Sequence, residues 1–338
     1  MSPPLKFDRR FVVAAALVLL AALVVPRGLL GAVVAIAIVL LVLAPLPPPT
    51  RPVVGAVMAG LATGVASINL FAPGIFQEHV TREFGWTQPQ YAGVITVGTV
   101  VTVVSSAFVG TLFDRYGVRR WAIAGIVLLA AMLISLRWLT PNLWHFYGVF
   151  ALLPILAAGT SSIAYSRVIA RWFDRRRGQA FGAALAGIGV GGAILSPLTQ
   201  FLIAQLGWRD AYAGLGLLGL CVTLPIVWWA LYDTPAERGL APDGEPLAPA
   251  PITPNAHPAP ARDAGSAATA GAGAYPTPIG YSAGESLRQQ RFWRMLVAFV
   301  LMAFAIGGVM LQFVPILRAR GVPAEQAVAV LGALSIAL

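Results

Sequence analysis

The chain has 338 residues, of which 58% are hydrophobic and only 11% are charged. A soluble domain carries roughly a quarter charged residues, so this composition excludes an ordinary soluble fold. The net charge of +10 raises the question of a nucleic-acid partner. Basic residues also collect in the cytoplasmic loops of membrane proteins, and we favour that explanation, with no nucleic acid as partner. The single cysteine, Cys221, excludes an internal disulfide and a Cys-rich metal site.

The apolar residues fall in uninterrupted runs of about twenty residues, which is the length of a helix that crosses a bilayer. Inside lipid every backbone N–H and C=O group must be paired within the protein, and only helices and closed barrels achieve this. The runs lack the alternation of barrel strands. The sequence therefore predicts an all-α, polytopic membrane protein whose first partner is the lipid bilayer.

Two apolar runs, at residues 11–25 and 29–46, predict an N-terminal helical hairpin within residues 1–50. A basic start before a short apolar run is also typical of a signal sequence, so the first run leaves both interpretations open. The prolines at 47–49 then end the second helix, because proline cannot donate to the helical hydrogen-bond ladder.

Six further runs fill residues 51–232 and predict a six-helix bundle. They lie at residues 53–77, 89–113, 121–138, 143–172, 178–206 and 211–232. Residues 233–290 are dominated by Pro, Ala, Gly and Thr, which bury too little apolar surface to fold, and they predict a disordered cytoplasmic linker. Residues 291–338 contain two more runs, at 292–317 and from 324 to the end.

The distribution of arginine predicts how these helices are oriented. When the N-terminus is placed in the cytoplasm and the helices alternate, most basic residues lie on the cytoplasmic side. The consecutive Arg175, Arg176 and Arg177 are the densest example, and we interpret them as topology anchors more readily than as a binding site for lipid headgroups or a substrate anion. We expect a multi-pass protein of the cell inner membrane.

The loop between the second and third runs of the bundle has a specific spacing, GTLFDRYGVRR at residues 110–120. Glycines at both ends let two helices approach closely. Asp114 can pair with an arginine or with the positive N-terminus of a neighbouring helix. Such a contact can hold one conformation closed and release it in another. We therefore interpret this as a gating loop, with Gly110, Asp114, Arg115, Gly117, Arg119 and Arg120 as its functional residues.

This loop resembles the signature loop of the major facilitator superfamily. Members of that family have two six-helix halves joined by a long cytoplasmic loop. The resemblance implies that residues 51–232 are a complete first half and that residues 291–338 are the first two helices of a truncated second half. The N-terminal hairpin has no counterpart in this plan.

A second stretch is similar to the monocarboxylate-porter branch and to its bacterial relatives that resemble oxalate/formate antiporters. Trp172 and Phe173 precede the three arginines, and a series of small residues follows: Gly182, Ala186, Gly187, Gly189 and Gly191. The resemblance implies a secondary transporter that moves a small organic anion, a mono- or dicarboxylate, by alternating access. Protons or a counter-anion would drive it.

The small residues of that stretch also have a direct physical meaning. A helix face without side-chain bulk lets another helix pack on its backbone. Static close packing explains such a face, and so does a smooth surface on which two bundles rock. The sequence leaves both explanations open.

Polar residues within the apolar runs are the candidates for substrate binding, because they are costly to place in lipid. Hydrogen bonding between helices is the alternative for each. A guanidinium at position 167 could bind a carboxylate through paired N–H donors, reach to the interface, or pair with Asp114. The candidates are Asn69, Tyr165, Arg167, Gln200 and Gln312.

The sequence contains no catalytic constellation, no phosphate-binding loop of the G-x-x-x-x-G-K-[ST] type and no metal motif. We therefore expect neither an enzyme nor ATP-driven transport, and no cofactor. Two other functions stay open. One is a drug or cation exporter of the same superfamily, which would need an acidic residue facing its cavity. The other is a truncated membrane protein that does not transport.

Overall fold

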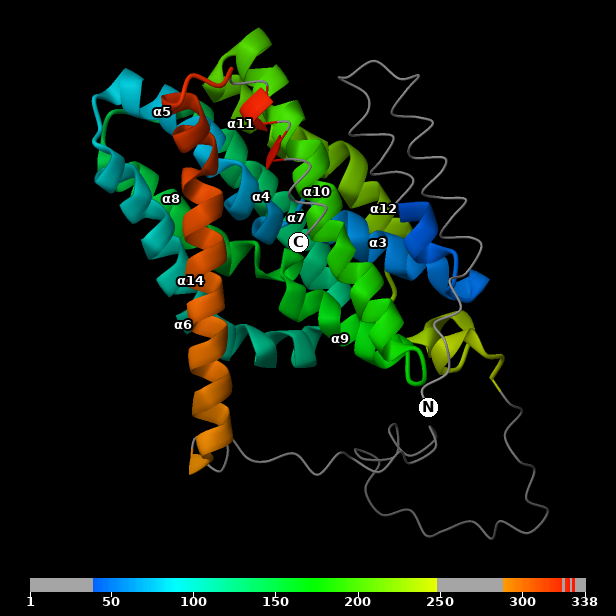
Figure 1. The fold of residues 1–338 in the computed structure, drawn as a ribbon. Helices are drawn as coiled ribbons and strands as arrows, with labels where there is room; N and C mark the ends of the chain where they lie inside the picture. Colours follow the sequence, from blue (N-terminus) through cyan, green and yellow to red (C-terminus); the bar gives the residue numbers. More distant parts are fainter. Residues whose placement is uncertain (1–38, 248–287, 324–325, 329, 332–338) are drawn as a thin grey trace, which may run out of the picture. The chain divides into compact units, whose positions relative to one another are not determined.

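The computed structural model describes residues 39–247, 288–323, 326–328 and 330–331 (Figure 1). Contacts divide the chain into two units, residues 1–247 with 309–338 and residues 248–308, and each is considered by itself. The predicted run at 11–25, most of the run at 29–46 and most of the run that begins at 324 lie outside the described residues. The predicted hairpin therefore stays a prediction.

The described elements are helices, which confirms the all-α fold class. In the bundle they are α3 (Arg51–Ala62), α4 (Val65–Phe71), α5 (Pro73–Phe84), α6 (Gln88–Tyr116), α7 (Val118–Ser135), α8 (Leu143–Leu156), α9 (Ser162–Trp172), α10 (Arg177–Leu206), α11 (Trp208–Leu218) and α12 (Leu224–Ala230). Farther along the chain lies α14 (Gln290–Ala319).

Among the described residues, four segments are long and apolar enough to cross a membrane. They are Pro48–Phe71, Val118–Trp138, Arg177–Leu206 and Trp208–Ala230. Large apolar side chains on the bundle surface, such as Val103 and Phe108, are more than 60% exposed. A soluble protein rarely leaves so much apolar surface in water, whereas lipid accepts it.

Three predicted runs depart from a single regular α-helix in the structure, and we call these three points the helix breaks. The first run is interrupted at Gly64, whose extended ψ of 176° separates α3 from α4. The fourth is interrupted by a 3-10 turn at Ala158–Thr160, after Pro154 in α8. The sixth stays helical and contains a π turn at Gly219–Thr223. Proline and glycine weaken the helix at these points. At the first of them, the Thr160 hydroxyl replaces a lost bond to the N–H of Val65.

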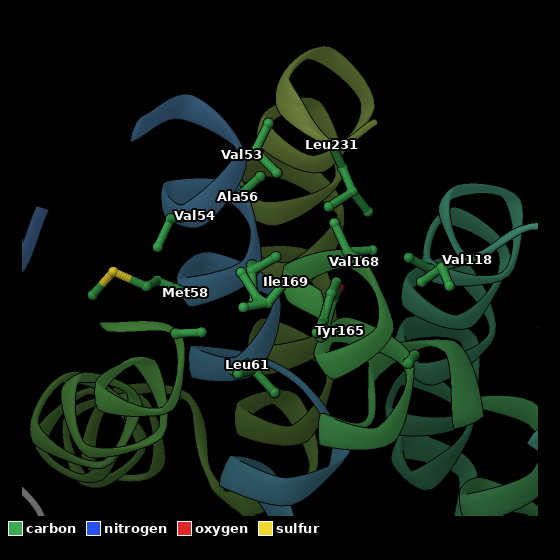
Figure 2. Close-up of a cluster of buried hydrophobic side chains, with 14 of the residues drawn as sticks. Val53, Val54, Ala56, Met58, Leu61, Val118, Tyr165, Val168, Ile169 and Leu231 are labelled. Carbon is green, nitrogen blue, oxygen red and sulfur yellow. The ribbon is translucent and has the colours of Figure 1, made fainter. Parts of the chain in front are cut away.

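The core lies where α3, α9 and the start of α7 meet (Figure 2). On α3, Val54, Met58 and Leu61 are buried at the three- and four-residue spacing of one helix face. Figure 2 shows Val54 and Met58 on one side of α3 and the α9 side chains of Tyr165 and Val168 toward its other side. In lipid such a core gains little from the hydrophobic effect, so close van der Waals packing stabilises it.

Helices α10 and α3 pack against each other with their backbones in close contact. A Cβ atom on Gly187 would lie 2.8 Å from the Cα of Met58, and one on Gly191 would lie 2.8 Å from the Cα of Ala62. A Cβ atom on Gly182, by contrast, would have nothing within 4 Å. The predicted small-residue face therefore packs on backbone at two of its positions.

We expect Gly191→Ala to destabilise the protein by about 1–3 kcal/mol, because the new methyl group must push α10 away from α3. Gly182→Ala is the matched control, with open space at the same helix, and should be neutral or slightly stabilising. Thermal unfolding of the purified variants in detergent measures the difference. Equal midpoints for the two variants would contradict the backbone contact.

Candidate functional site

The three helix breaks meet inside the bundle. The hydroxyls of Thr63, at the end of α3, and Thr223, in the π turn, share a hydrogen bond of 2.7 Å. The N–H of Val65, at the start of α4, donates to Thr160 Oγ1 at 3.2 Å. A Cβ on Gly64 would lie 2.6 Å from the Thr160 carbonyl oxygen, so glycine is required there. Tertiary contacts thus hold the broken ends against one another.

This meeting point of the breaks is the polar layer of an otherwise apolar bundle. Thr160 and Ser67 are fully buried, and Thr223 is 1% exposed. Non-helical backbone at membrane depth occurs where protein buries it or where it lines a water-filled cavity. A small cavity of about 10 Å³ borders Thr63, and the rest of its lining consists of apolar side chains and glycines. The hydroxyl groups of the layer bond to one another and to backbone groups.

Several buried side-chain oxygens have no hydrogen-bond partner within the described part of the chain. Asn69 Oδ1 on α4 and the Tyr165 hydroxyl oxygen on α9 are two of them, and both belong to predicted candidates. The others, which sequence reasoning missed, are Gln77 Oε1, Ser196 Oγ, Thr199 Oγ1 and the Tyr212 hydroxyl oxygen. Serine and threonine are easily overlooked in a sequence because in helices they usually bond to their own backbone. An unpaired buried polar group costs about 1–3 kcal/mol, so such groups are candidates to bind a ligand.

The predicted candidates differ in their surroundings. Tyr165 is 1% exposed, and its unpaired hydroxyl lies in the apolar core beside Gly60 (Figure 2). Gln200 is half-buried on α10, and Gln312 lies on α14. Asn69 is also half-buried, and its helix, α4, packs against α10, the helix of Gln200.

Arg167 connects α9 to the gating loop. Its Nη1 donates to the carbonyl oxygen of Gly110 at 2.8 Å, and its guanidinium lies 5.8 Å from the ring centroid of Phe113. A guanidinium that binds a helix carbonyl and an aromatic ring positions the end of α6. Of the alternatives for Arg167, these two contacts favour a role at this loop. The side chain of Asp114 lies outside the described residues.

Within the gating loop, Gly117 has a φ of +82° and immediately precedes α7. The N–H of Arg119, in the first turn of α7, donates to Asp233 Oδ1 at 2.8 Å. Asp233 belongs to the predicted linker, but its first residues, 233–247, form two 3-10 turns at Pro235–Arg238 and Pro242–Gly244. Residues 248–287 of the linker lie outside the described residues. We call the end of the bundle that carries Arg119 and residues 233–247 the basic end.

A second charged network ties the opposite end together. Glu83, at the end of α5, accepts from Trp208 Nε1 at 2.5 Å and pairs with Arg209 at 2.9 Å. The Arg209 guanidinium also lies 4.4 Å from the Trp208 ring centroid. Arg137 and Asp210 form another pair at 2.9 Å. These contacts hold the starts and ends of helices together at the opposite end of the bundle.

A family model described as Major Facilitator Superfamily matches residues 55–338. The chain belongs to this superfamily. The match confirms the resemblance carried by the loop at residues 110–120 and includes the whole six-helix bundle except its first residues.

Relatives within the superfamily carry transporter names. The chain is 28% identical over 187 residues to Probable anion transporter 3, chloroplastic, of Oryza sativa subsp. japonica, covering 54% of this chain and 35% of that protein. It is 27% identical over 157 residues to human Monocarboxylate transporter 14, covering 45% and 30%. It is 32% identical over 202 residues to mouse Monocarboxylate transporter 11, covering 58% and 40%. The chain thus spans 30% to 40% of the length of these relatives.

One titratable group near the opposite end has a shifted pKa. Burial, and to a lesser degree the charge of Arg82, lowers the pKa of His79 on α5. The folded state therefore disfavours the protonated imidazole, and stability falls as the pH drops through about 6.5. We expect the thermal midpoint to fall less between about pH 7.5 and pH 5.5 in His79→Gln than in the unaltered protein.

The control for this comparison is His145→Gln, which replaces an exposed histidine at the start of α8. It should keep the pH dependence of the unaltered protein. If both variants show the same pH dependence, burial of His79 does not contribute.

Proposed function

We propose that this protein is a secondary active transporter that moves a small organic anion, a mono- or dicarboxylate, across the inner membrane by alternating access. Proton coupling or exchange for a counter-anion drives it, and its N-terminus lies in the cytoplasm. Membership in the superfamily supports transport. The relatives named anion transporter and monocarboxylate transporter support the substrate class.

The observation that carries the choice of an anion is the absence of acids from the interior of the membrane-spanning segments. Within the four spans of the described residues, the sole acid is Asp210, in the first turn of α11 at the opposite end. A carboxylate in the interior would repel an anionic substrate and would be the natural partner of a cation. The interior therefore suits an anion better than the cation of a drug exporter.

Neutral polar side chains on α4 and α10 supply the binding chemistry of this proposal. Asn69 lies one turn beyond the break at Gly64, on the same helix segment that begins at Val65. An amide donates two N–H bonds to a carboxylate, and hydroxyls such as Thr199 donate one each. Charge-assisted bonds of this kind are roughly twice as strong as neutral ones. A small carboxylate can therefore be held without a basic residue at mid-bundle.

Reconstituted proteoliposomes test the proposal with labelled lactate, pyruvate, formate and oxalate. We expect uptake of at least one carboxylate, and we expect Asn69→Ala to raise its KM about tenfold, as the loss of a hydrogen bond to a charged group predicts. The control is Ser135→Ala, because the Ser135 hydroxyl bonds to the Met132 carbonyl of its own helix. It should leave the KM unchanged.

Three results would contradict this proposal in different ways. Efflux of cationic dyes without carboxylate uptake would identify an exporter. No movement of either class would identify a membrane protein that does not transport. Carboxylate uptake with equal KM values in both variants would remove Asn69 from the substrate site.

A separate prediction concerns the gating loop, where Asp114→Asn removes a charge but keeps the size of the side chain. We expect the turnover of carboxylate exchange to fall while the KM changes little, because the loop contacts a moving element and not the substrate. Initial rates over a range of concentrations separate the two constants. Asp174→Asn, in the next basic loop, is the control for loss of charge alone and should leave the turnover unchanged. An unchanged turnover in Asp114→Asn would contradict the gating role.

A further inference from the structure

Residues 231–247, which follow the sixth membrane span, form a folded strap over the basic end, and we name this segment the clasp. Its first anchor is Asp233. One carboxylate oxygen accepts from the N–H of Arg119 at 2.8 Å, at the positive N-terminus of α7. The Arg119 side chain also contacts α12 and the clasp. Its Nη2 donates to the Trp228 carbonyl of α12 at 2.6 Å, and its guanidinium lies 4.8 Å from the ring centroid of Tyr232 in the clasp.

The second carboxylate oxygen of Asp233 explains why residue 117 of the gating loop is a glycine. A Cβ on Gly117 would lie 2.5 Å from Asp233 Oδ2, and the φ of +82° disfavours any other residue. Gly117 is thus required for two reasons, of which one is a contact with a residue more than a hundred positions later in the sequence. The gating loop and the clasp therefore fit closely together, because Gly117 leaves room for the Asp233 carboxylate.

The second anchor is Asp243 of the clasp, which binds the loop that joins α9 to α10. Its carboxylate accepts from three consecutive backbone N–H groups, those of Asp174 at 3.3 Å, Arg175 at 2.9 Å and Arg176 at 3.3 Å. Asp243 itself has a φ of +61°, an unfavourable conformation that these three bonds offset. The start of α10 has no cap from its own N-cap side chain, and Asp243 binds the turn that leads into it.

The clasp also contacts the start of α3 and the end of α9. A Cβ on Gly244 would lie 2.9 Å from a methyl group of Thr50, and Trp172 Nε1 donates to the Tyr232 carbonyl at 2.9 Å. Figure 1 shows this yellow segment beside the loop between α9 and α10. Four helix ends at the basic end are therefore joined through one segment of the chain: those of α3, α7, α9 and α10.

We propose that the clasp positions the gating loop, with Asp233 as the positioning residue for residues 115–120 and Asp243 as the second anchor that fixes the clasp to the bundle. In this arrangement the loop moves only together with the starts of α3 and α10, so the six-helix bundle changes orientation as one body. The proposal rests on the proposed function for its consequence in transport, but not for the geometry of the clasp.

Distance measurements between spin labels test the geometry without any substrate. In a Cys221→Ser background, Tyr116→Cys at the end of α6 and Ala236→Cys on the clasp place labels at two exposed positions. We expect a single narrow distance distribution, and we expect Asp233→Ala to broaden it. Asp210→Asn, which removes one acid at the opposite end, should leave it narrow.

A double-mutant comparison tests the contact between Asp233 and Gly117. Gly117→Ala should broaden the distribution in the protein that has Asp233, and add little further broadening once Asp233→Ala has removed the colliding carboxylate. Equal and independent effects of the two substitutions would overturn the contact. Asp243→Ala keeps Asp233 in place and should free the clasp end alone, which keeps the test meaningful if Asp233→Ala fails to fold.

Transport kinetics test the consequence. We expect Asp233→Ala to lower turnover about tenfold, the effect of losing one charge-assisted bond, with the KM of the carboxylate unchanged. A merely structural loss would lower the amount of folded protein and leave the turnover of the folded fraction as it was. A narrow label distance in Asp233→Ala overturns the clasp. Absence of carboxylate transport in the unaltered protein, with broadening still caused by Asp233→Ala, overturns the proposed function and leaves the clasp.

Discussion

Satisfaction of backbone hydrogen bonds in lipid is the constraint on which the rest of this structure depends. It makes every membrane-crossing segment a helix, and it makes each departure from the helix a place where another group must take over. At Gly64 the hydroxyl of Thr160 binds the N–H of Val65, and at the π turn Thr63 binds Thr223. The polar layer inside the bundle consists of the hydroxyl groups that join these helix breaks to one another.

The same constraint explains the basic end, where helices leave the membrane. The N-termini of α7 and α10 carry unpaired N–H groups and positive partial charge. Neither helix begins with a side chain that caps it. Asp233 serves α7, and Asp243 serves the turn before α10. One short segment thus caps α7 and binds the turn that leads into α10, and Gly117 of the loop leaves room for it.

Two kinds of contact hold the described bundle together. Backbone packing of α10 on α3 at Gly187 and Gly191 is rigid, because nothing between the helices can change rotamer. The carboxylates of Asp233 and Asp243 add charge-assisted hydrogen bonds to backbone N–H groups at the basic end. Under the proposed function, both kinds of contact keep the bundle in one piece while it changes orientation.

The sequence by itself determined the all-α membrane fold and the family, because hydropathy and loop spacing are local properties. The gating role of the loop at residues 110–120 stays a prediction. The sequence also located Gly187 and Gly191 on a packing face. It did not show the breaks in the first, fourth and sixth runs, since each break depends on a partner far away in the chain, such as Thr160 for Gly64. Only the tertiary structure placed Tyr165 in the core, and only it joined Asp233 to Gly117, because a proline-rich composition does not reveal that two aspartates fit two helix ends.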